Sequence, residues 1–429
     1  MMARRVPLRV VCLMLCMTLF TPALLRAQAS DQKLSEIIPN LFFDTAVDEL
    51  AALEAVFPGS LAFVPDSILR PRFETAFAMN NLMGMQVSGF PLGSSGGGFS
   101  WTFDPAVGTF NRASGTFGPV FTERALTVGR RRMNFGVNYQ RSTFDKLEGK
   151  SLADGDVKLY TGFTTPGVTA FFEDSFRLKL TTDTVGLFAM YGVTDRFDVG
   201  VAVPIIHVDM EAALDFTATV RFGASASTSE LFVGTPVTGS ATGIGDIVVR
   251  TKYQFLRRQG GGLAAGVDLR LPTGDELDLL GAAGGQTKFY VAGSAERGRI
   301  SPHVNFGFTV SGESDAAKSD ETFVFAPSDE INFAGGVDLA VSPRLTLVGD
   351  LIGRTIRDTI VLNEAATPFG GSFRQFRGDT GNLNILLGSV GVKFNPMGQG
   401  LIAFNVLFPL NENGLTDNLT WLGGFEFSF

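Results

Sequence analysis

The last nine residues, WLGGFEFSF, alternate between two kinds of side chain. One side of an extended chain would carry Trp421, Gly423, Phe425, Phe427 and Phe429, and the other would carry Leu422, Gly424, Glu426 and Ser428. A period of two residues is the period of a β-strand. The pattern therefore predicts a terminal strand with one apolar and one more polar face.

The same alternation recurs through the chain from residue 184 to the C-terminus. It is visible in RFDVGVAVPI (196–205), GDIVVRTKYQF (245–255), AAGVDLRL (264–271), HVNFGFTV (303–310), INFAGGVDLAV (331–341) and GLIAFNVLF (400–408). Tight turns are expected near 193–196, 257–262, 297–299, 342–344 and 395–400. Longer polar connections are expected near 207–243, 273–285, 311–329, 356–381 and 411–418. A soluble β-sandwich also alternates, but short turns at one end and long loops at the other are typical of outer-membrane β-barrels.

The predicted fold class is therefore all-β, a transmembrane antiparallel up-and-down β-barrel. Counting back from Phe429 gives eleven strands to about residue 184, and VTAFFEDSFRLKL (168–180) makes a twelfth. The segments 119–128 and 132–141 would raise the number to fourteen. An even number is expected when both chain ends are periplasmic, so we expect about 14 strands, with 12 as the alternative.

The N-terminal part of the chain has a different pattern. Residues 1–29 carry Arg4, Arg5 and Arg9, then an apolar run and Ala27-Gln28-Ala29, which predicts a secretory signal peptide. After it, residues 30–82 lose the alternation and show helical spacing, as in AVDELAALEAV. We expect residues 30–95 to form a partly helical segment, either a plug in the lumen or a periplasmic tail, and residues 96–429 to form the barrel. No later apolar stretch reaches the ~20 residues of a membrane helix, so only a closed barrel could span a membrane.

Composition excludes several classes of function. Four arginines and no acid lie in residues 1–29, which leaves 31 basic and 43 acidic residues, a net charge of −12 that argues against nucleic-acid binding. Cys12 and Cys16 both lie in the predicted signal peptide, so a mature disulfide or thiolate metal site is excluded.

Candidate catalytic and metal-binding groups are few. His207 and His303 are the only histidines, and both are expected near the rims of the barrel. Asp275, Glu276 and Asp278 could bind calcium, but a solvated loop is the simpler interpretation. We expect neither an enzyme nor a cofactor.

The polar faces of the strands predict which side chains line the lumen. The candidates are Arg177, Lys179, Arg250, Lys252, Asp268, Arg270, Lys288, Asn305, Asp338 and Asp350. Across all predicted strands the basic and acidic residues on these faces nearly balance, so no strong ion selectivity is expected. The alternative is that these charges pair across neighbouring strands and simply fill the barrel.

Three motifs carry a resemblance to a known family. They are the turn Thr194-Asp195-Arg196, the strand start Gly243-Ile244-Gly245-Asp246 and the strand end Leu271-Pro272-Thr273-Gly274. In this order, over roughly 184–429, the chain resembles the outer-membrane proteins grouped under the meta-cleavage pathway of phenol degradation. Those proteins are distant relatives of the long-chain fatty-acid and aromatic-hydrocarbon channels. The terminal Phe425, Phe427 and Phe429 likewise resemble the signal by which envelope machinery recognises outer-membrane barrels.

The resemblance implies a channel of the bacterial outer membrane that passes small hydrophobic or aromatic compounds. The expected partners are membrane lipid, lipopolysaccharide, the barrel-assembly machinery and a small apolar or aromatic ligand. The alternative is a structural or adhesive barrel whose long loops at 207–243 and 356–381 bind an external partner.

Overall fold

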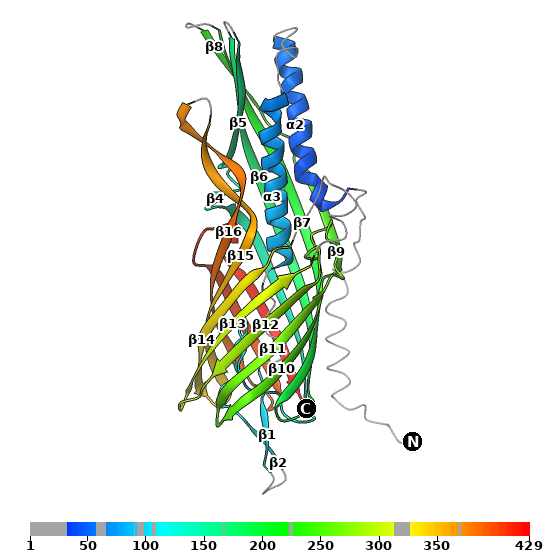
Figure 1. The fold of residues 1–429 in the computed structure, drawn as a ribbon, viewed down its shortest axis with the longest axis vertical. Coiled ribbons are helices and arrows are strands. Elements are labelled where there is room, and N and C mark those ends of the chain that lie inside the picture. Colours follow the sequence, from blue (N-terminus) through cyan, green and yellow to red (C-terminus); the bar gives the residue numbers. More distant parts are fainter. Residues whose placement is uncertain are drawn as a thin grey trace, which may run out of the picture.

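A computed structural model describes residues 32–56, 66–89, 91, 98–104, 109–165, 168–222, 226–312, 327–367 and 370–429. The predicted signal peptide lies outside the described residues. Two helices, a closed antiparallel barrel and a small separate hairpin make up the described part of the chain (Figure 1).

Twelve strands close the barrel, so the all-β barrel fold is confirmed with the smaller of the two expected strand numbers. Closure is made by the last strand, which pairs with the first barrel strand, so that Phe425 lies opposite Val137. The barrel strands are β3 (Met133–Leu147), β6 (Val168–Gly192), β7 (Phe197–Phe222), β10 (Ile247–Arg258), β11 (Gly261–Leu271), β12 (Gln286–Ser294), β13 (Ile300–Ser311), β14 (Glu330–Ser342), β15 (Leu345–Thr367), β16 (Gly370–Phe394), β17 (Gly400–Pro409) and β19 (Thr420–Ser428).

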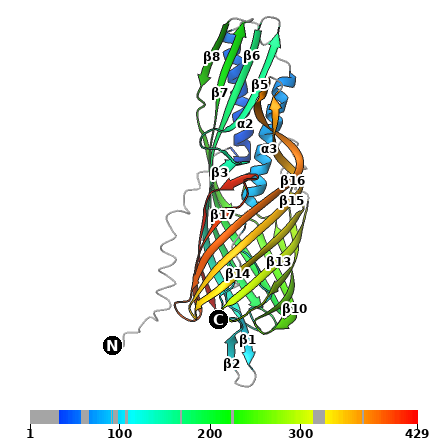
Figure 2. The ribbon, with the colours of Figure 1, turned by 90° about the vertical axis from the view of Figure 1, so that its left-hand side faces the viewer.

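Seven short strands complete the β-structure of the described residues. Five extend the barrel sheet beyond one end: β4 (Lys150–Ser151), β5 (Val157–Thr165), β8 (Ala226–Phe232), β9 (Val237–Ile244) and β18 (Leu415–Asp417). The other two, β1 (Trp101–Asp104) and β2 (Thr109–Arg112), form a separate hairpin that projects from the opposite end (Figure 2).

The expected number of fourteen strands is wrong for two reasons. Residues 168–180 and 184–192, counted as two strands, are one continuous 25-residue strand, β6. Residues 119–128, counted as a strand, form no strand and are not part of the sheet. The expected loops at 207–243 and 356–381 are also largely strand, because β7, β8, β9, β15 and β16 run on beyond the barrel as paired ribbons.

An apolar belt surrounds the barrel. Outward side chains such as Phe289, Val304 and Phe306 are more than half exposed, while the intervening Lys288, Asn305 and Gly307 face inward. Since water cannot stabilise so many exposed apolar side chains, the belt is the surface that lipid covers. The short connections lie at the end of the barrel where the C-terminus lies, and this end is periplasmic in barrels of this kind. The protein is thus an outer-membrane β-barrel.

The outer face of β6 changes from apolar to charged along the strand, which corrects one prediction. Near the periplasmic end, the outward residues are apolar, for example Leu187. Beyond the belt, Leu178 and Leu180 are buried on the inner side, and Arg177 and Lys179 alternate with them on the outer side. Arg177 and Lys179 are therefore not lumen residues, because water, and not lipid, surrounds this part of the strand.

The two helices explain why the interior is apolar at this level. Helices α2 (Leu34–Val56) and α3 (Asp66–Ser88) lie at the end opposite the C-terminus, among the strands that run on beyond the barrel (Figures 1 and 2). Ile38 and Phe42 of α2 and Met79 and Leu82 of α3 are fully buried in one core with Phe176 and its neighbours. Neither described helix is long and apolar enough to cross a membrane. The helical character expected for this segment is confirmed, whereas the domain boundaries at 29 and 95 stay predictions.

Candidate functional site

The periplasmic half of the lumen is filled by two stretches, residues 98–100 and 113–128, which we call the plug. Phe99 and Phe117 are buried against Leu401 of β17, with their ring centroids 5.7 Å apart. The plug forms no helix or strand, so its main-chain N–H and C=O groups have no partners from regular secondary structure. Such backbone must find hydrogen-bond partners when it is buried.

The inner faces of the strands supply those partners. Asn305 of β13 accepts a hydrogen bond from the Glu123 N–H at 2.6 Å, and Asp198 of β7 accepts one from the Val128 N–H at 2.9 Å. Lys393 of β16 is buried and donates to the carbonyl oxygen of Pro119 at 2.9 Å. These contacts come from strands all around the barrel, so the plug is fastened to the wall.

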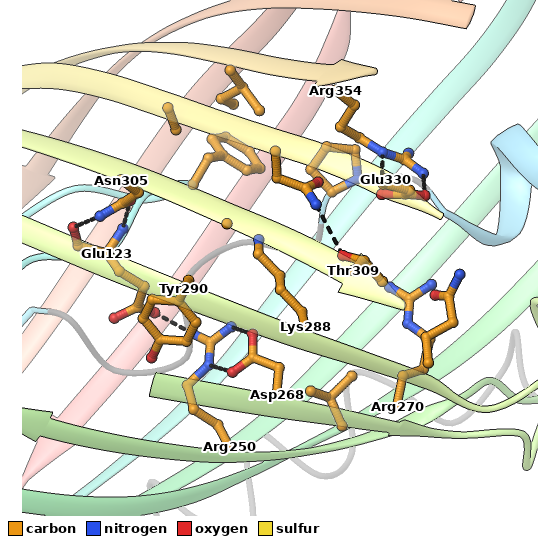
Figure 3. Close-up of a pocket in the computed structure, with 18 of the residues that line it drawn as sticks. Glu123, Arg250, Asp268, Arg270, Lys288, Tyr290, Asn305, Thr309, Glu330 and Arg354 are labelled. Atoms are coloured by element: carbon orange, nitrogen blue, oxygen red, sulfur yellow. Dashed lines mark hydrogen bonds and ion pairs between the residues drawn. The ribbon is translucent and has the colours of Figure 1, made fainter. Parts of the chain in front are cut away.

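A cavity of about 210 Å³ lies above the plug. Its floor includes Phe121 and Glu123 of the plug, and Gly89 and Pro91, which follow α3, lie at its other end. The wall comes mainly from β10 to β15 and includes Arg250, Asp268, Arg270, Lys288, Tyr290, Asn305, Glu330 and Arg354 (Figure 3). The lumen therefore holds a chamber that lies between the plug and the end of α3.

Most charges around the chamber are paired. Arg250 binds Asp268 on the neighbouring strand through two hydrogen bonds of 2.7 and 2.6 Å and also contacts Glu123 of the plug. Lys252 contacts Glu123 from the same strand at 3.3 Å. Bidentate arginine–carboxylate pairs of this kind fix orientation as well as adding attraction.

A second crevice of about 100 Å³ lies on the extracellular side of the chamber, beside α3. Gly89, Arg270, Gln286, Glu330 and Arg354 line both hollows. The crevice and the chamber are thus neighbours across a shared set of side chains.

Two arginines at this boundary hold the end of α3. Arg354 donates to the Gly89 carbonyl oxygen at 2.6 Å and forms an ion pair with Glu330, and Arg270 donates to the Ser88 carbonyl oxygen at 3.3 Å. The carbonyl groups at a helix C-terminus carry partial negative charge and favour cations. We call these contacts of Arg270 and Arg354 with residues 88 and 89 the latch.

The structure brings together six of the lumen candidates named from the sequence. Arg250, Asp268, Arg270, Lys288 and Asn305 line the chamber, and Lys252 reaches it through Glu123. Asp338 and Asp350 lie nearer the periplasmic end and flank the buried His303, whose Nε2 is 2.7 Å from Asp350. His207 lies on the outer side of β7, bonded to Thr242 and Asp209.

The polar faces of the predicted strands also put Arg354 in the lumen, and it lines the chamber. Sequence reasoning missed Glu123, Tyr290 and Glu330. Tyr290 and Glu330 lie on the inner sides of their strands, and the alternating pattern could have assigned them. Glu123 could not be found in this way, because residues 119–128 were expected to be a strand.

Two family-like motifs meet at the extracellular rim. Asp246 accepts hydrogen bonds from the N–H groups of Gly274 and Ala282, at 3.1 and 2.8 Å. Thr273 accepts from the Ile247 N–H and donates to the Gly245 carbonyl oxygen. The motifs around Gly243 and Pro272 therefore join β10 to the loop after β11, whereas Asp195 and Arg196 lie in the periplasmic turn before β7, where the Asp195 carbonyl oxygen binds Thr127.

The acidic loop at 275–278 binds a residue of the chain itself. Lys33, just before α2, lies 2.8 Å from Asp275 and 2.7 Å from Asp278. These hydrogen bonds raise the pKa of the Lys33 ammonium above its ordinary value. In the described part of the chain, no group of three or more His, Cys, Asp or Glu residues is placed to hold a metal ion.

Comparison with known proteins places the chain in a family. The family model described as "Putative MetA-pathway of phenol degradation" matches residues 154–414. None of the curated proteins matches the sequence.

Several solved structures align with the chain at low similarity. A Pseudomonas aeruginosa FadL homologue aligns at 13% identity and a TM-score of 0.31, covering 80% of this chain and 96% of its own. The Ralstonia pickettii toluene transporter TbuX aligns at 10% identity and a TM-score of 0.34, covering 70% and 90%. Because these TM-scores and identities are low, the assignment of the chain to a family rests on the family match alone.

Proposed function

The chain belongs to this phenol-degradation family, and from that premise we propose that it is an outer-membrane channel for small hydrophobic or aromatic compounds. One observation carries the proposal: the lumen holds a bounded chamber between a fastened plug and a latched helix. An open pore for polar solutes would need a continuous aqueous path, which the plug interrupts. A chamber of this size with aromatic side chains in its wall suits one small solute at a time.

In this proposal the solute enters through the crevice beside α3 and passes the latch into the chamber. The latch is the natural gate, because the crevice and the chamber share its residues. Release of the two arginines from residues 88 and 89 would let the end of α3 move without breaking the barrel. Movement of the plug would complete passage to the periplasm.

Engineered cysteines can test this route, because Cys12 and Cys16 are the only cysteines of the chain. Met85 of α3 and Thr359 of β15 are in contact, with Sδ 3.3 Å from Oγ1, so the pair Met85→Cys/Thr359→Cys places two thiols within reach of a short bifunctional thiol reagent that can be cleaved by reduction. Cells that express the protein should take up labelled toluene faster than cells with an empty vector. Cross-linking of the double variant with this reagent should abolish the gain, and a reductant should restore it.

The single variant Thr359→Cys is the matched control, since it carries a thiol but cannot form the cross-link. Uptake equal to that of the empty vector would contradict the channel. Uptake that is unchanged by the cross-link would keep the channel and exclude the route past α3.

The proposed partners outside the lumen follow from the surface. The apolar belt would contact membrane lipid, and the charged collar beyond it, which includes Arg141 and Asp183, would face lipopolysaccharide. Phe429 would serve as the recognition signal for the assembly machinery. In the folded barrel its ring stacks on Phe135, with centroids 5.5 Å apart, beside the seam between β19 and β3.

A further inference from the structure

The chamber carries an excess of positive charge. Its lining includes four basic side chains, Arg250, Arg270, Lys288 and Arg354, against three acidic ones, Glu123, Asp268 and Glu330. Four minus three leaves one positive charge that the lining residues do not balance.

Each of the three carboxylates already forms an ion pair with another basic side chain. Asp268 has both oxygens on Arg250, Glu330 has both on Arg354, and Glu123 is shared by Arg250 and Lys252. The excess charge therefore cannot be neutralised by a small rotation of a neighbouring acid.

Two of the four basic side chains have no carboxylate partner in the described part of the chain. Arg270 is hydrogen-bonded to the Ser88 carbonyl oxygen, and the other is Lys288, which lies between Asp268 on one neighbouring strand and Thr309 on the other. Asp268 is bound to Arg250, and the Thr309 hydroxyl accepts a hydrogen bond from Asn332 at 2.9 Å. The Lys288 ammonium has no hydrogen bond or ion pair with any residue that the structure describes, and Figure 3 shows it directed between the strands toward the chamber.

An ammonium group withdrawn from water without a counter-ion is unfavourable. Natural membrane proteins keep such groups where they bind a partner. The partner that removes the cost here is a ligand with one negative charge.

The side chains around Lys288 indicate that the uncharged part of the ligand is an aromatic ring. Tyr290 follows two residues later on the same face, and Phe121 and Phe188 complete an aromatic part of the lining. The hydroxyl of Tyr290 is buried without a partner among the described residues. A dry cavity of ~150 Å³ is enough to hold benzene, so the chamber of about 210 Å³ has room for one ring and a small substituent.

We propose that the chamber is a binding site for an aromatic monocarboxylate, with the carboxylate on Lys288 and the ring against Tyr290. This inference rests on the proposed channel function and narrows its substrate class. Neutral aromatic compounds would enter the same chamber but leave the Lys288 charge uncompensated.

Calorimetry on the refolded full mature chain in detergent tests the proposal, with benzoate, the neutral isostere benzamide, and acetate as probes. Benzoate should bind more tightly than both other probes. Lys288→Met should weaken benzoate binding by about tenfold or more, as expected for loss of a charge-assisted hydrogen bond, and should leave benzamide binding unchanged. Lys288→Arg should retain benzoate binding.

Lys179→Met is the matched control, because Lys179 is exposed on the outer side of β6, and it should bind benzoate like the unmodified chain. Retention of the barrel in each variant is checked by heat-modifiable electrophoretic migration. If Lys288→Met does not fold, Lys288→Gln replaces it, and Lys288→Arg still separates charge from size.

The remaining outcomes separate this proposal from the channel itself. Equal binding of benzoate and benzamide, insensitive to Lys288→Met, would overturn the carboxylate site and leave the channel proposal standing. Acetate that competes as well as benzoate would overturn the aromatic part of the site. Absence of binding for both aromatic probes would overturn the site, and the uptake of toluene then decides separately on the proposed channel.

Discussion

At the scale of single residues, the chamber is defined by which charges have partners. Arg354 has two, the Glu330 carboxylate and the Gly89 carbonyl oxygen, whereas Lys288 has none among the described residues. Both are basic side chains on the inner face of a strand, but Arg354 is held in the latch and Lys288 is free to bind a ligand. They differ because Arg354 has Glu330 on the neighbouring strand and the end of α3 beside it.

Arg354→Gln should loosen the latch. Charge-assisted hydrogen bonds contribute roughly 1.5–3 kcal/mol each, so the end of α3 should be released more often. The Gly89 amide, which donates to the Met85 carbonyl oxygen, should therefore exchange its hydrogen faster than in the unmodified chain. The control is Arg374→Gln, an exposed arginine of β16. Equal exchange rates at Gly89 in both variants would contradict the latch.

Glu148, on the extracellular side between β3 and β4, gives a prediction about pH. It accepts a hydrogen bond from the Gly414 N–H at 2.9 Å, and burial raises the pKa of its carboxyl above the ordinary value, although that hydrogen bond acts in the opposite direction. Burial of Glu148 in the folded chain therefore favours the protonated acid. The folded arrangement around Glu148 and Gly414 should be most stable at low pH and should lose stability as the pH rises through the raised pKa.

The measurement is hydrogen-exchange protection of the Gly414 amide, corrected for intrinsic exchange. Protection should decrease with rising pH in the unmodified chain. Glu148→Gln keeps an acceptor and removes the charge, so its protection should no longer depend on pH. A pH dependence that survives the substitution would assign the effect to another group.

At the scale of elements, β6 shows that one strand can have two environments. The outward residues are apolar where the outside is lipid, as at Leu187, and charged where the outside is water and α2 lies within, as at Lys179. Every second residue from Phe172 to Met190 faces inward, so the facing of the strand does not shift along it. Only the medium outside and the packing inside change.

Two leucine-to-arginine substitutions in β6 should therefore destabilise different parts of the protein. Leu178→Arg would place a charge in the helix core and should release α2 and α3 while the barrel remains. Leu187→Arg would place it on the lipid face and should destabilise the barrel by roughly 2–4 kcal/mol if it lies near the midplane. Limited proteolysis reports the helices, and urea unfolding of the barrel reports the strands. Equal behaviour of the two variants would contradict the division of β6.

At the scale of the whole molecule, two parts of the chain that precede β3 occupy the lumen at different levels. The helices and the latch lie on the extracellular side, and the plug lies on the periplasmic side. In the proposed channel both parts would move when a solute passes.

Truncations should separate the two closures. A mature chain that begins at residue 98 lacks both helices but keeps the plug, and it should stay without large conductance steps. A chain that begins at residue 132 lacks the plug as well and should show large steps in a planar bilayer. Large steps in the first truncation would show that the plug does not block the lumen by itself.

The sequence by itself determined the barrel, its membrane belt and most of the inner faces, because a period of two and an alternation of turn lengths are local properties of the chain. The alternation predicted that Arg250, Asp268 and Lys288 lie on the polar faces of their strands, and in the structure all three line the chamber. The sequence also carries the three motifs behind the resemblance to the family. These features depend only on residues that are close in the sequence.

Only the tertiary structure decided the strand number, the plug, the latch and the change from apolar to charged side chains on the outer face of β6. Residues 119–128 alternate like a strand, but the sheet is already closed, so they lie in the lumen and bind its polar wall. Arg177 and Lys179 alternate like lumen residues, but they stand above the membrane, where the polar face belongs outside. Alternation shows that two faces differ, and the medium on each side decides which face is inside.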